Sequence, residues 1–236
     1  MSEGYVLGAY WGPRPESAEK CAERLHVFLT GLRDCHESLS QWYQKADSRK
    51  KSLQRPLESL EAPSLIEILN GGRNRENASG TVSEDLGFQI GLWNGQKGDE
   101  KASFSLRCGL YWRSATPSVS VGNCVVLDLP KNLGTLASPQ RMSQALAVTA
   151  LAWQPDWAGV MSESSMLARN FDAEVPFVDW MVYVPHKVEG IAEPASISAL
   201  PGHGSIVVVQ PNPPSVSSAA SQALISSVEN VVKRSC

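Results

Sequence analysis

The spacing of apolar residues at the start of the chain has first the period of a strand and then that of a helix. Residues 4–11 (GYVLGAYW) alternate as a strand does, with both faces at least partly covered. Gly12 and Pro13 end this strand, because proline has no N–H to donate to a sheet. Over residues 18–32 the apolar side chains recur every three or four positions, which predicts a helix. We therefore expect a strand, a tight corner and a helix, with Trp11 in the core at the corner.

After this helix the chain becomes more polar, and its apolar positions predict only short helices. One is expected around residues 39–43 and another after Pro63, where Gly71 and Gly72 end the pattern as glycines do beyond a helix. The basic run at residues 45–55 (KADSRKKSLQR) carries no interleaved aromatic residues. This composition favours a solvated loop or helix face over a nucleic-acid contact.

The second half of the chain contains most of the expected strands. Two strand-like runs flank a glycine-rich, charged connection, which is typical of a hairpin. The serine-proline pair at residues 138–139 predicts the start of a helix that runs to Trp153. Residues 185–201 are punctuated by prolines and predicted to be a loop, and a last helix is expected over residues 215–233. The strands are expected at residues 4–11, 86–94, 102–111, 119–129, 158–162, 178–184 and 205–210.

The order of these elements predicts the fold class. Strand and helix do not alternate regularly, as they would in a parallel fold, and the strands gather in the middle of the chain. We therefore expect an α+β fold, with a mainly antiparallel sheet of about six to seven strands and helices packed against it. The sequence contains no internal repeat and no linker long enough to divide domains. Residues 1–236 are therefore predicted to form a single domain.

The composition is that of a globular protein with a substantial core. Of the 236 residues, 42% are hydrophobic and 19% are charged, and 7 are tryptophan. The net charge of −3 argues against general nucleic-acid binding, which usually requires a basic excess, and it is too small for a nucleic-acid mimic. The first residues lack the basic and apolar regions of a signal peptide, and no apolar run approaches the length of a membrane span. We expect a cytoplasmic protein with no membrane contact.

The residues that usually carry catalysis or bind metals are scattered along the chain. The five cysteines form no CxxC pair, which favours buried free thiols over a zinc or redox site. The four histidines lack metal-ligand spacing to carboxylates or thiolates. Cys35 next to His36 is poor support for a catalytic dyad, because neighbours in sequence point in different directions. We therefore expect no catalytic residue, no metal and no cofactor.

The polar segment at residues 71–85 (GGRNRENASGTVSED) offers the best surface candidates. Arg73, Asn74 and Arg75 lie in this predicted loop, and guanidinium and amide groups recognise carboxylates and backbone well. The alternative is a solvated loop with an ion pair to one of its own glutamates. Asp156, in WQPDW, is interpreted as a turn or capping residue between two tryptophans that pack, in preference to a catalytic acid.

Several short motifs follow one another in a specific order. Their joint order and spacing resemble the immunity protein 52 family, and the resemblance covers nearly the whole chain. The motifs are GAYWGPR at residues 8–14, GRNR at 72–75, LGFQIGLWNG at 86–95, WQPDW at 153–157, VDWMVYV at 178–184 and LPGHGSIVVVQ…PPSV at 200–216.

The resemblance implies an antitoxin that protects the cell producing a polymorphic toxin. Such toxins are delivered by type VI or related secretion systems and are often nucleases of the restriction-endonuclease type. The partner implied is therefore the cognate toxin, with no nucleic acid and no membrane involved. Steric blockade or disruption of toxin assembly is expected in preference to charge mimicry. Two alternatives stay open: a chaperone or adaptor of the effector, and an enzyme that reverses the toxin's modification.

The resemblance also separates residues expected to hold the fold from residues expected to touch a toxin. The shared motifs consist largely of glycine, tryptophan and strand residues, which suits the first role, whereas toxin contacts are expected in loops. The residues expected to hold the fold are Trp11, Arg14, Trp93, Asn94, Asp156 and Trp157. The residues expected to contact the toxin are Arg73, Asn74, Arg75, Glu58, Glu61, Trp112 and Arg113.

Overall fold

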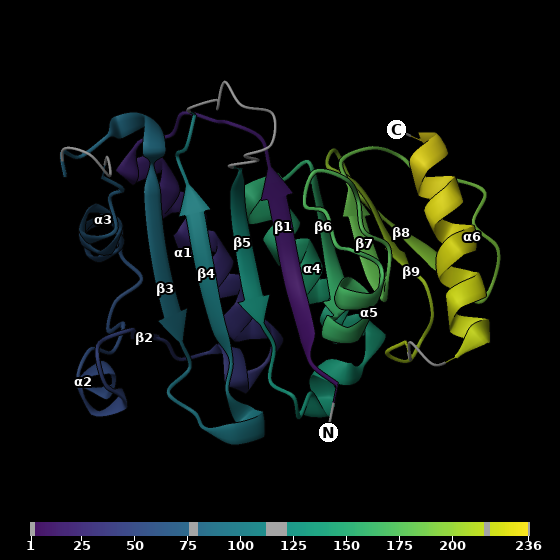
Figure 1. Ribbon diagram of the computed structural model, residues 1–236, viewed down its shortest axis with the longest axis horizontal. Coiled ribbons are helices and arrows are strands. Elements are labelled where there is room, and N and C mark those ends of the chain that lie inside the picture. Colours follow the sequence, from purple (N-terminus) through teal and green to yellow (C-terminus); the bar gives the residue numbers. More distant parts are fainter. Residues whose placement is uncertain (1–2, 76–79, 112–121, 215–217, 236) are drawn as a thin grey trace.

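An open antiparallel sheet crosses the whole width of the molecule (Figure 1). The computed structural model describes residues 3–75, 80–111, 122–214 and 218–235. Within these ranges nine strands pair in the order β2-β3-β4-β5-β1-β6-β7-β9-β8, and every neighbouring pair is antiparallel. The strands are β1 Tyr5–Trp11, β2 Tyr43–Gln44, β3 Phe88–Trp93, β4 Ser103–Cys108, β5 Asn123–Asp128, β6 Trp157–Ser162, β7 Met181–Val184, β8 Ser196–Leu200 and β9 Gly204–Val208.

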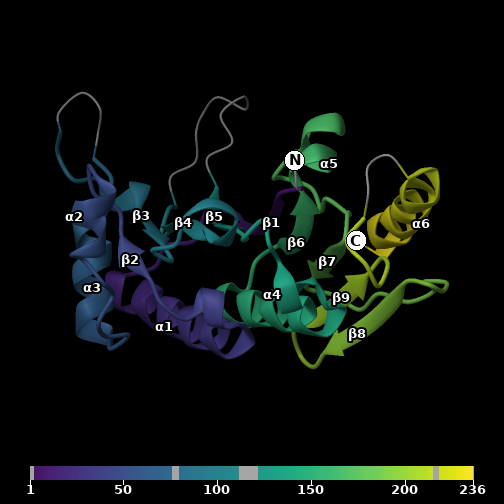
Figure 2. The ribbon, with the colours of Figure 1, turned by 90° about the horizontal axis from the view of Figure 1, so that it is seen from below.

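Helices cover the two faces of the sheet unequally (Figure 2). The long helices α1 and α4 lie along one face, with α3 next to α1 at the β2–β3 end. The last helix, α6, packs on the other face at the β7–β9 end. The helices of the described ranges are α1 Ala18–Cys35, α2 Arg49–Leu53, α3 Ala62–Gly71, α4 Pro139–Trp153, α5 Glu163–Ala168 and α6 Ala219–Ser235.

The alternation of side chains along each strand explains why both faces need cover. On β1, Leu7 and Trp11 belong to the main core, which also contains the buried faces of α1 and α4. Tyr10 points to the opposite face, where it packs against Trp157 in a smaller cluster. The valines of β7 and β9 on that opposite face pack against Ile225 and other apolar residues of α6. The strand predicted over residues 4–11 is therefore buried on both faces, as its alternating pattern indicated.

Two serines fix the starts of the long helices. The Ser17 Oγ accepts a hydrogen bond from the Lys20 N–H at 3.3 Å, and the Ser138 Oγ accepts one from the Arg141 N–H at 3.2 Å. Pro139 follows at the first position of α4, where its missing N–H costs nothing. The helix start predicted at residues 138–139 is confirmed.

The α+β class with a mainly antiparallel sheet is confirmed, and the sheet has two more strands than the seven positions predicted. The extra strands, β2 and β8, lie at the two edges. The helix expected around residues 39–43 is wrong: Glu37–Leu39 forms one 3-10 turn, and Tyr43 begins β2. Pairing of β2 with Trp93 and Leu92 of β3 decides this segment, so a tertiary contact overrides the local pattern.

Candidate functional site

The motifs GAYWGPR and WQPDW, far apart in the sequence, meet at the corner between β1 and α1. The rings of Trp11 and Trp153 stack with centroids 5.5 Å apart, and the Arg14 guanidinium lies 5.2 Å from the centroid of the Trp11 ring. Arg14 donates hydrogen bonds to the carbonyls of Trp153 at 2.8 Å and Gln154 at 3.2 Å. Asp156 accepts the Gly12 N–H at 2.8 Å. These contacts join the end of β1 to the end of α4.

The LGFQIGLWNG motif similarly organises the hairpin of β3 and β4. The Asn94 side chain is buried, and its Oδ1 accepts the N–H groups of Gln96 and Ala102. Its Nδ2 donates to the carbonyls of Glu100 at 2.9 Å and Ser38 at 3.2 Å. One amide thus satisfies backbone groups on both sides of the hairpin connection, which a shorter or apolar side chain would leave unpaired.

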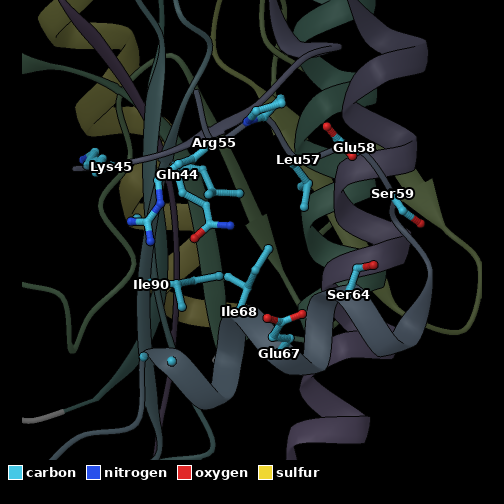
Figure 3. Close-up of a pocket in the computed structure, with 15 residues that line it drawn as sticks. Gln44, Lys45, Arg55, Leu57, Glu58, Ser59, Ser64, Glu67, Ile68 and Ile90 are labelled. Carbon is cyan, nitrogen blue, oxygen red and sulfur yellow. The ribbon is translucent and has the colours of Figure 1, made fainter. Parts of the chain in front are cut away.

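A hollow of about 660 Å³ lies at the β2–β3 end of the sheet, between α3 and the connection from α2 to α3. Leu57, Ile68 and Ile90 turn toward one another inside it (Figure 3). Glu58 and Glu67 stand on its helical side in the same view. We call this feature the edge hollow; it is lined by Gln44, Lys45, Arg55, Pro56, Leu57, Glu58, Ser59, Ser64, Glu67, Ile68, Gly71, Gly72, Ile90, Gly91 and Leu92.

The charged side chains of the edge hollow are exposed and unpaired. Lys45, Arg55, Glu58 and Glu67 all line it and are all exposed. Among the described residues, none of the four lies within 4.0 Å of an opposite charge, although ion pairs form elsewhere on the surface. The hollow therefore has an apolar floor and a rim of two cations and two carboxylates that are free to pair with another molecule.

The GRNR motif lies against a second hollow, of about 440 Å³, which shares Lys45, Gly72, Ile90 and Gly91 with the first. A side chain at Gly72 would place its Cβ 2.4 Å from the Gln89 carbonyl oxygen, so only glycine fits this approach.

Arg73 and Asn74 both make contacts within the fold. The Arg73 Nε donates to the Asn70 Oδ1 at 3.0 Å, and its guanidinium lies 5.1 Å from the centroid of the Phe88 ring. The Asn74 Nδ2 donates to the Leu86 carbonyl at 2.7 Å.

Of the remaining predicted contact residues, the structure describes Arg75 and Glu61, and both are exposed. Arg75 is exposed and donates to the Gly80 carbonyl at 3.0 Å, within its own loop. Glu61 precedes α3 without capping it and lines a third hollow of about 510 Å³ on the α1 side, together with Glu58. Trp112 and Arg113 lie outside the described residues. Of the predicted set, the structure therefore places Glu58, Arg73 and Asn74 along two adjoining hollows and Glu61 beside Glu58 in the third.

Three charged residues of the edge hollow are not among the contacts predicted from the sequence: Lys45, Arg55 and Glu67. Lys45 and Arg55 belong to the basic run at residues 45–55, and nothing in that run indicates that it borders α3. The feature of the sequence that could have indicated them is a run with a net positive charge, followed closely by the acidic residues Glu58 and Glu67.

The side chains that line the edge hollow bring carboxylate, amine, guanidinium, hydroxyl and amide groups together. Its lining residues include neither cysteine nor histidine. In the described part of the chain, no group of three or more metal-ligating side chains comes together. Cys21, Cys35 and Cys108 are buried free thiols, and Cys124 is partly buried.

Among the described residues, the most deeply buried carboxyl group lies far from this hollow, near α5. Burial raises the pKa of Asp179 above its ordinary value, against the lowering effect of the hydrogen bonds from Ser162. The Asp179 Oδ2 accepts the Ser162 N–H at 2.7 Å and the Ser162 hydroxyl at 2.9 Å. This carboxyl group therefore braces the start of α5 against β7. In the described ranges, no helix combines the length and the apolar character that a bilayer span requires.

Comparison with known proteins identifies the family. The model of "Immunity protein 52" matches residues 3–236. No curated protein matches the chain. Among solved structures, the "Pseudomonas aeruginosa T6SS protein PA0821" has a similar fold, with a TM-score of 0.56 at 12% sequence identity over 99% of this chain and 73% of that one. The two motif clusters that hold the corner and the hairpin, together with a family match over nearly the full length, lead to one conclusion: the chain belongs to the immunity protein 52 family.

Proposed function

We propose that this protein binds and neutralises a cognate toxin of a type VI secretion system by direct protein–protein contact in the cytoplasm of the producing cell. Membership of an immunity protein family supports the antitoxin role. The fold shared with a P. aeruginosa T6SS protein supports the secretion-system association. The sequence further resembles TsiT, the immunity partner of the type VI effector TseT. We propose a toxin of that kind, a DNase of the restriction-endonuclease type.

The observation that carries the proposal is the edge hollow. Protein interfaces combine a desolvated apolar centre with a polar rim, and a few anchoring side chains supply most of the binding energy. The edge hollow offers both parts: Leu57, Ile68 and Ile90 can receive an apolar anchor of the toxin, and unpaired charges surround them. Toxin contact at Glu58 and Arg73, expected from the sequence, would continue this same surface.

The mixed charge of the rim bears on how the toxin is silenced. A surface that mimics DNA presents carboxylates alone, whereas Lys45 and Arg55 face the same hollow as Glu58 and Glu67. A rim that can form ion pairs with both positive and negative groups of the toxin suits steric blockade or disruption of toxin assembly. Protection also requires tight binding, with a Kd on the order of nanomolar, from an interface of roughly 1,600 Å² in total.

The test is capture of the toxin encoded beside this protein, followed by a nuclease assay on the mixture. We expect stable 1:1 capture and loss of DNA cleavage. Capture with cleavage intact would indicate a chaperone or adaptor and contradict the proposal. Protection of cells without capture would indicate an enzyme that reverses the toxin's modification.

A matched pair of charge reversals tests the position of the contact. Lys45→Glu should weaken toxin binding by at least about tenfold, because it removes an unpaired cation and adds a third carboxylate to a rim that already holds Glu58 and Glu67. Lys97→Glu makes the same change in net charge at an exposed position outside the hollow and should leave the Kd unchanged. Titration calorimetry of both variants measures the difference, and equal affinities would place the contact elsewhere.

A further inference from the structure

The two edges of the sheet are finished in different ways. At one edge β2 is two residues long, and its outer side is occupied: the Gln44 N–H donates to the Arg55 carbonyl, and Tyr43 forms a bridge with Pro56. At the other edge β8 pairs with β9 along its whole length in regular register. No such cover is found on the outer side of β8 among the described residues.

Strand β8 lacks the features that usually protect an edge. Its sequence, SISAL, contains no charged residue, no proline and no glycine, and Pro194 and Pro201 lie outside it. Edge strands are normally protected by lysine, proline, bulges or a covering element, because their free N–H and C=O groups invite another strand. Four of its five residues are exposed, and the Ile197 side chain is 36% exposed.

The pairing pattern shows which backbone groups face outward. The Val209 N–H donates to the Trp180 carbonyl, just before β7. The backbone N–H and C=O groups of every second residue of β9, including those of Val207, therefore point toward β7. The backbone groups of Ile206, and of the residues two positions before and after it, therefore point toward β8, where Ser198 is the partner of Ile206. It follows that the N–H and C=O groups of Ile197 and Ala199 point away from the sheet. No backbone hydrogen bond to either group is found on that side among the described residues.

We propose that β8 is a self-association surface, and that its occupant is β8 of a second copy of this chain. A two-fold axis through Ser198 places Ile197 opposite Ala199 of the second copy, and the reverse. In each of these pairs the two residues then exchange two N–H···O=C hydrogen bonds, because the N–H and C=O groups of both residues point outward. The two Ser198 side chains meet at the axis, where hydroxyls can hydrogen-bond. Because β8 carries no charge, like-charge repulsion does not oppose this pairing.

The same geometry limits the assembly to a dimer. In the part of the chain that the structure describes, β8 is the one open edge, because the β2 edge is occupied, so a second copy leaves no edge for a third. The contact is isologous and closed. A five-residue strand on each side forms an interface in the small class, below about 1,200 Å², where association is weak. We therefore expect a Kd on the order of tens of micromolar.

The test uses the full chain alone, with sedimentation equilibrium from micromolar to near-millimolar protein. The wild type should change from monomer to dimer over this range. Ala199→Pro removes an outward N–H and leaves the β9 ladder intact, as prolines at free edges do. It should raise the dimer Kd at least tenfold with an unchanged thermal melt. Ala199→Ser, which keeps the N–H, is the matched control and should dimerise like the wild type.

A second variant protects the test if Ala199→Pro fails to fold. Ile197→Lys keeps every backbone donor but sets two like charges on the edge, and it should also raise the dimer Kd at least tenfold. A wild type that stays monomeric over the whole range would overturn the proposal. So would a dimer that persists in both folded variants, because it would then use another face. None of these outcomes depends on toxin binding.

Discussion

Arg14 connects three parts of the corner at which the chain makes its first turn. Its guanidinium binds two carbonyls at the end of α4, lies over Trp11 and pairs with Glu16 at 3.2 Å. The Glu16 carboxylate is 5% exposed and also receives Arg24 at 2.6 Å. The position is therefore part of a partly buried ionic network within the fold, remote from the edge hollow.

Arg14→Ala should lower the free energy of unfolding by about 2 kcal/mol, because it leaves carbonyls and part of a buried carboxylate unpaired. Toxin affinity, corrected for the folded fraction, should not change. Chemical denaturation and calorimetry on the same sample measure both quantities. An unchanged denaturation midpoint together with lost binding would place Arg14 in the interface and contradict this assignment.

Asp179 makes stability depend on pH. Burial raises its pKa in the folded protein above that in the unfolded chain, so the folded state holds the proton more tightly. Between the two pKa values the native state binds more protons, and stability must fall as pH rises through this window. The Ser162 hydrogen bonds limit the rise in pKa but do not reverse it.

Asp179→Asn should reduce this loss of stability with rising pH. The amide oxygen can still accept from Ser162, whereas the buried charge is gone. Urea unfolding from about pH 4 to about pH 7 measures the free energy of unfolding of both proteins. As pH rises, that of the variant should increase relative to that of the wild type. Asp99→Asn, at an exposed site, should run parallel to the wild type. A pH-independent difference for Asp179→Asn would refute the assignment.

At the scale of elements, one glycine sets the approach of the two helices that cover the main core. A Cβ built at Gly31 of α1 would lie 2.4 Å from the Val148 Cγ1 of α4 and 2.7 Å from its Cγ2. Valine is stiff at χ1 and cannot move aside easily. Helix propensity opposes this packing effect, since alanine is favoured over glycine by about 1 kcal/mol inside a helix.

Gly31→Ala alone should therefore lower stability by about 1–2 kcal/mol, the cost of overpacking less the gain in propensity. Adding Val148→Ala should make the same substitution at Gly31 stabilising, because the clash is gone. A double-mutant cycle from denaturant unfolding measures the change of sign. Stabilisation by Gly31→Ala in the wild-type background would mean that the helices can separate without cost.

At the scale of the whole molecule, the two proposed surfaces lie at opposite ends of the nine-strand order. The edge hollow lies at the β2–β3 end and the free edge at β8. Seven strands separate β2 from β8, so a β8-mediated dimer leaves both edge hollows at its outer ends.

We therefore expect the two events to be independent. Lys45→Glu should leave the dimer Kd unchanged, and Ala199→Pro should leave toxin affinity unchanged. At high concentration, light scattering should detect a complex of two toxins with two copies of this protein. Loss of toxin binding in Ala199→Pro with an unchanged melt would show instead that β8 takes part in the toxin contact.

The sequence by itself determined the elements whose period is set by burial. Residues 4–11 and 18–32 bury regular faces, so their patterns predicted β1 and α1, and Ser138 with Pro139 predicted the start of α4 from capping chemistry alone. The antiparallel α+β class followed from the order of these elements. The family resemblance also rested on sequence, and the family match supports it.

Only the tertiary structure decided the features that arise from pairing between distant segments. Residues 43–44 form a strand because β3 offers them an edge, and the mostly exposed residues 196–200 form one because β9 does. The edge hollow exists for the same reason: β2 and α3 bring Lys45 and Arg55 opposite Glu58 and Glu67. Charged residues and exposed apolar residues do not recur with a regular period in the sequence, so the sequence pattern does not predict which residues lie next to them in space. Local sequence therefore specifies burial along one element, whereas the surfaces that bind other molecules depend on how the elements meet.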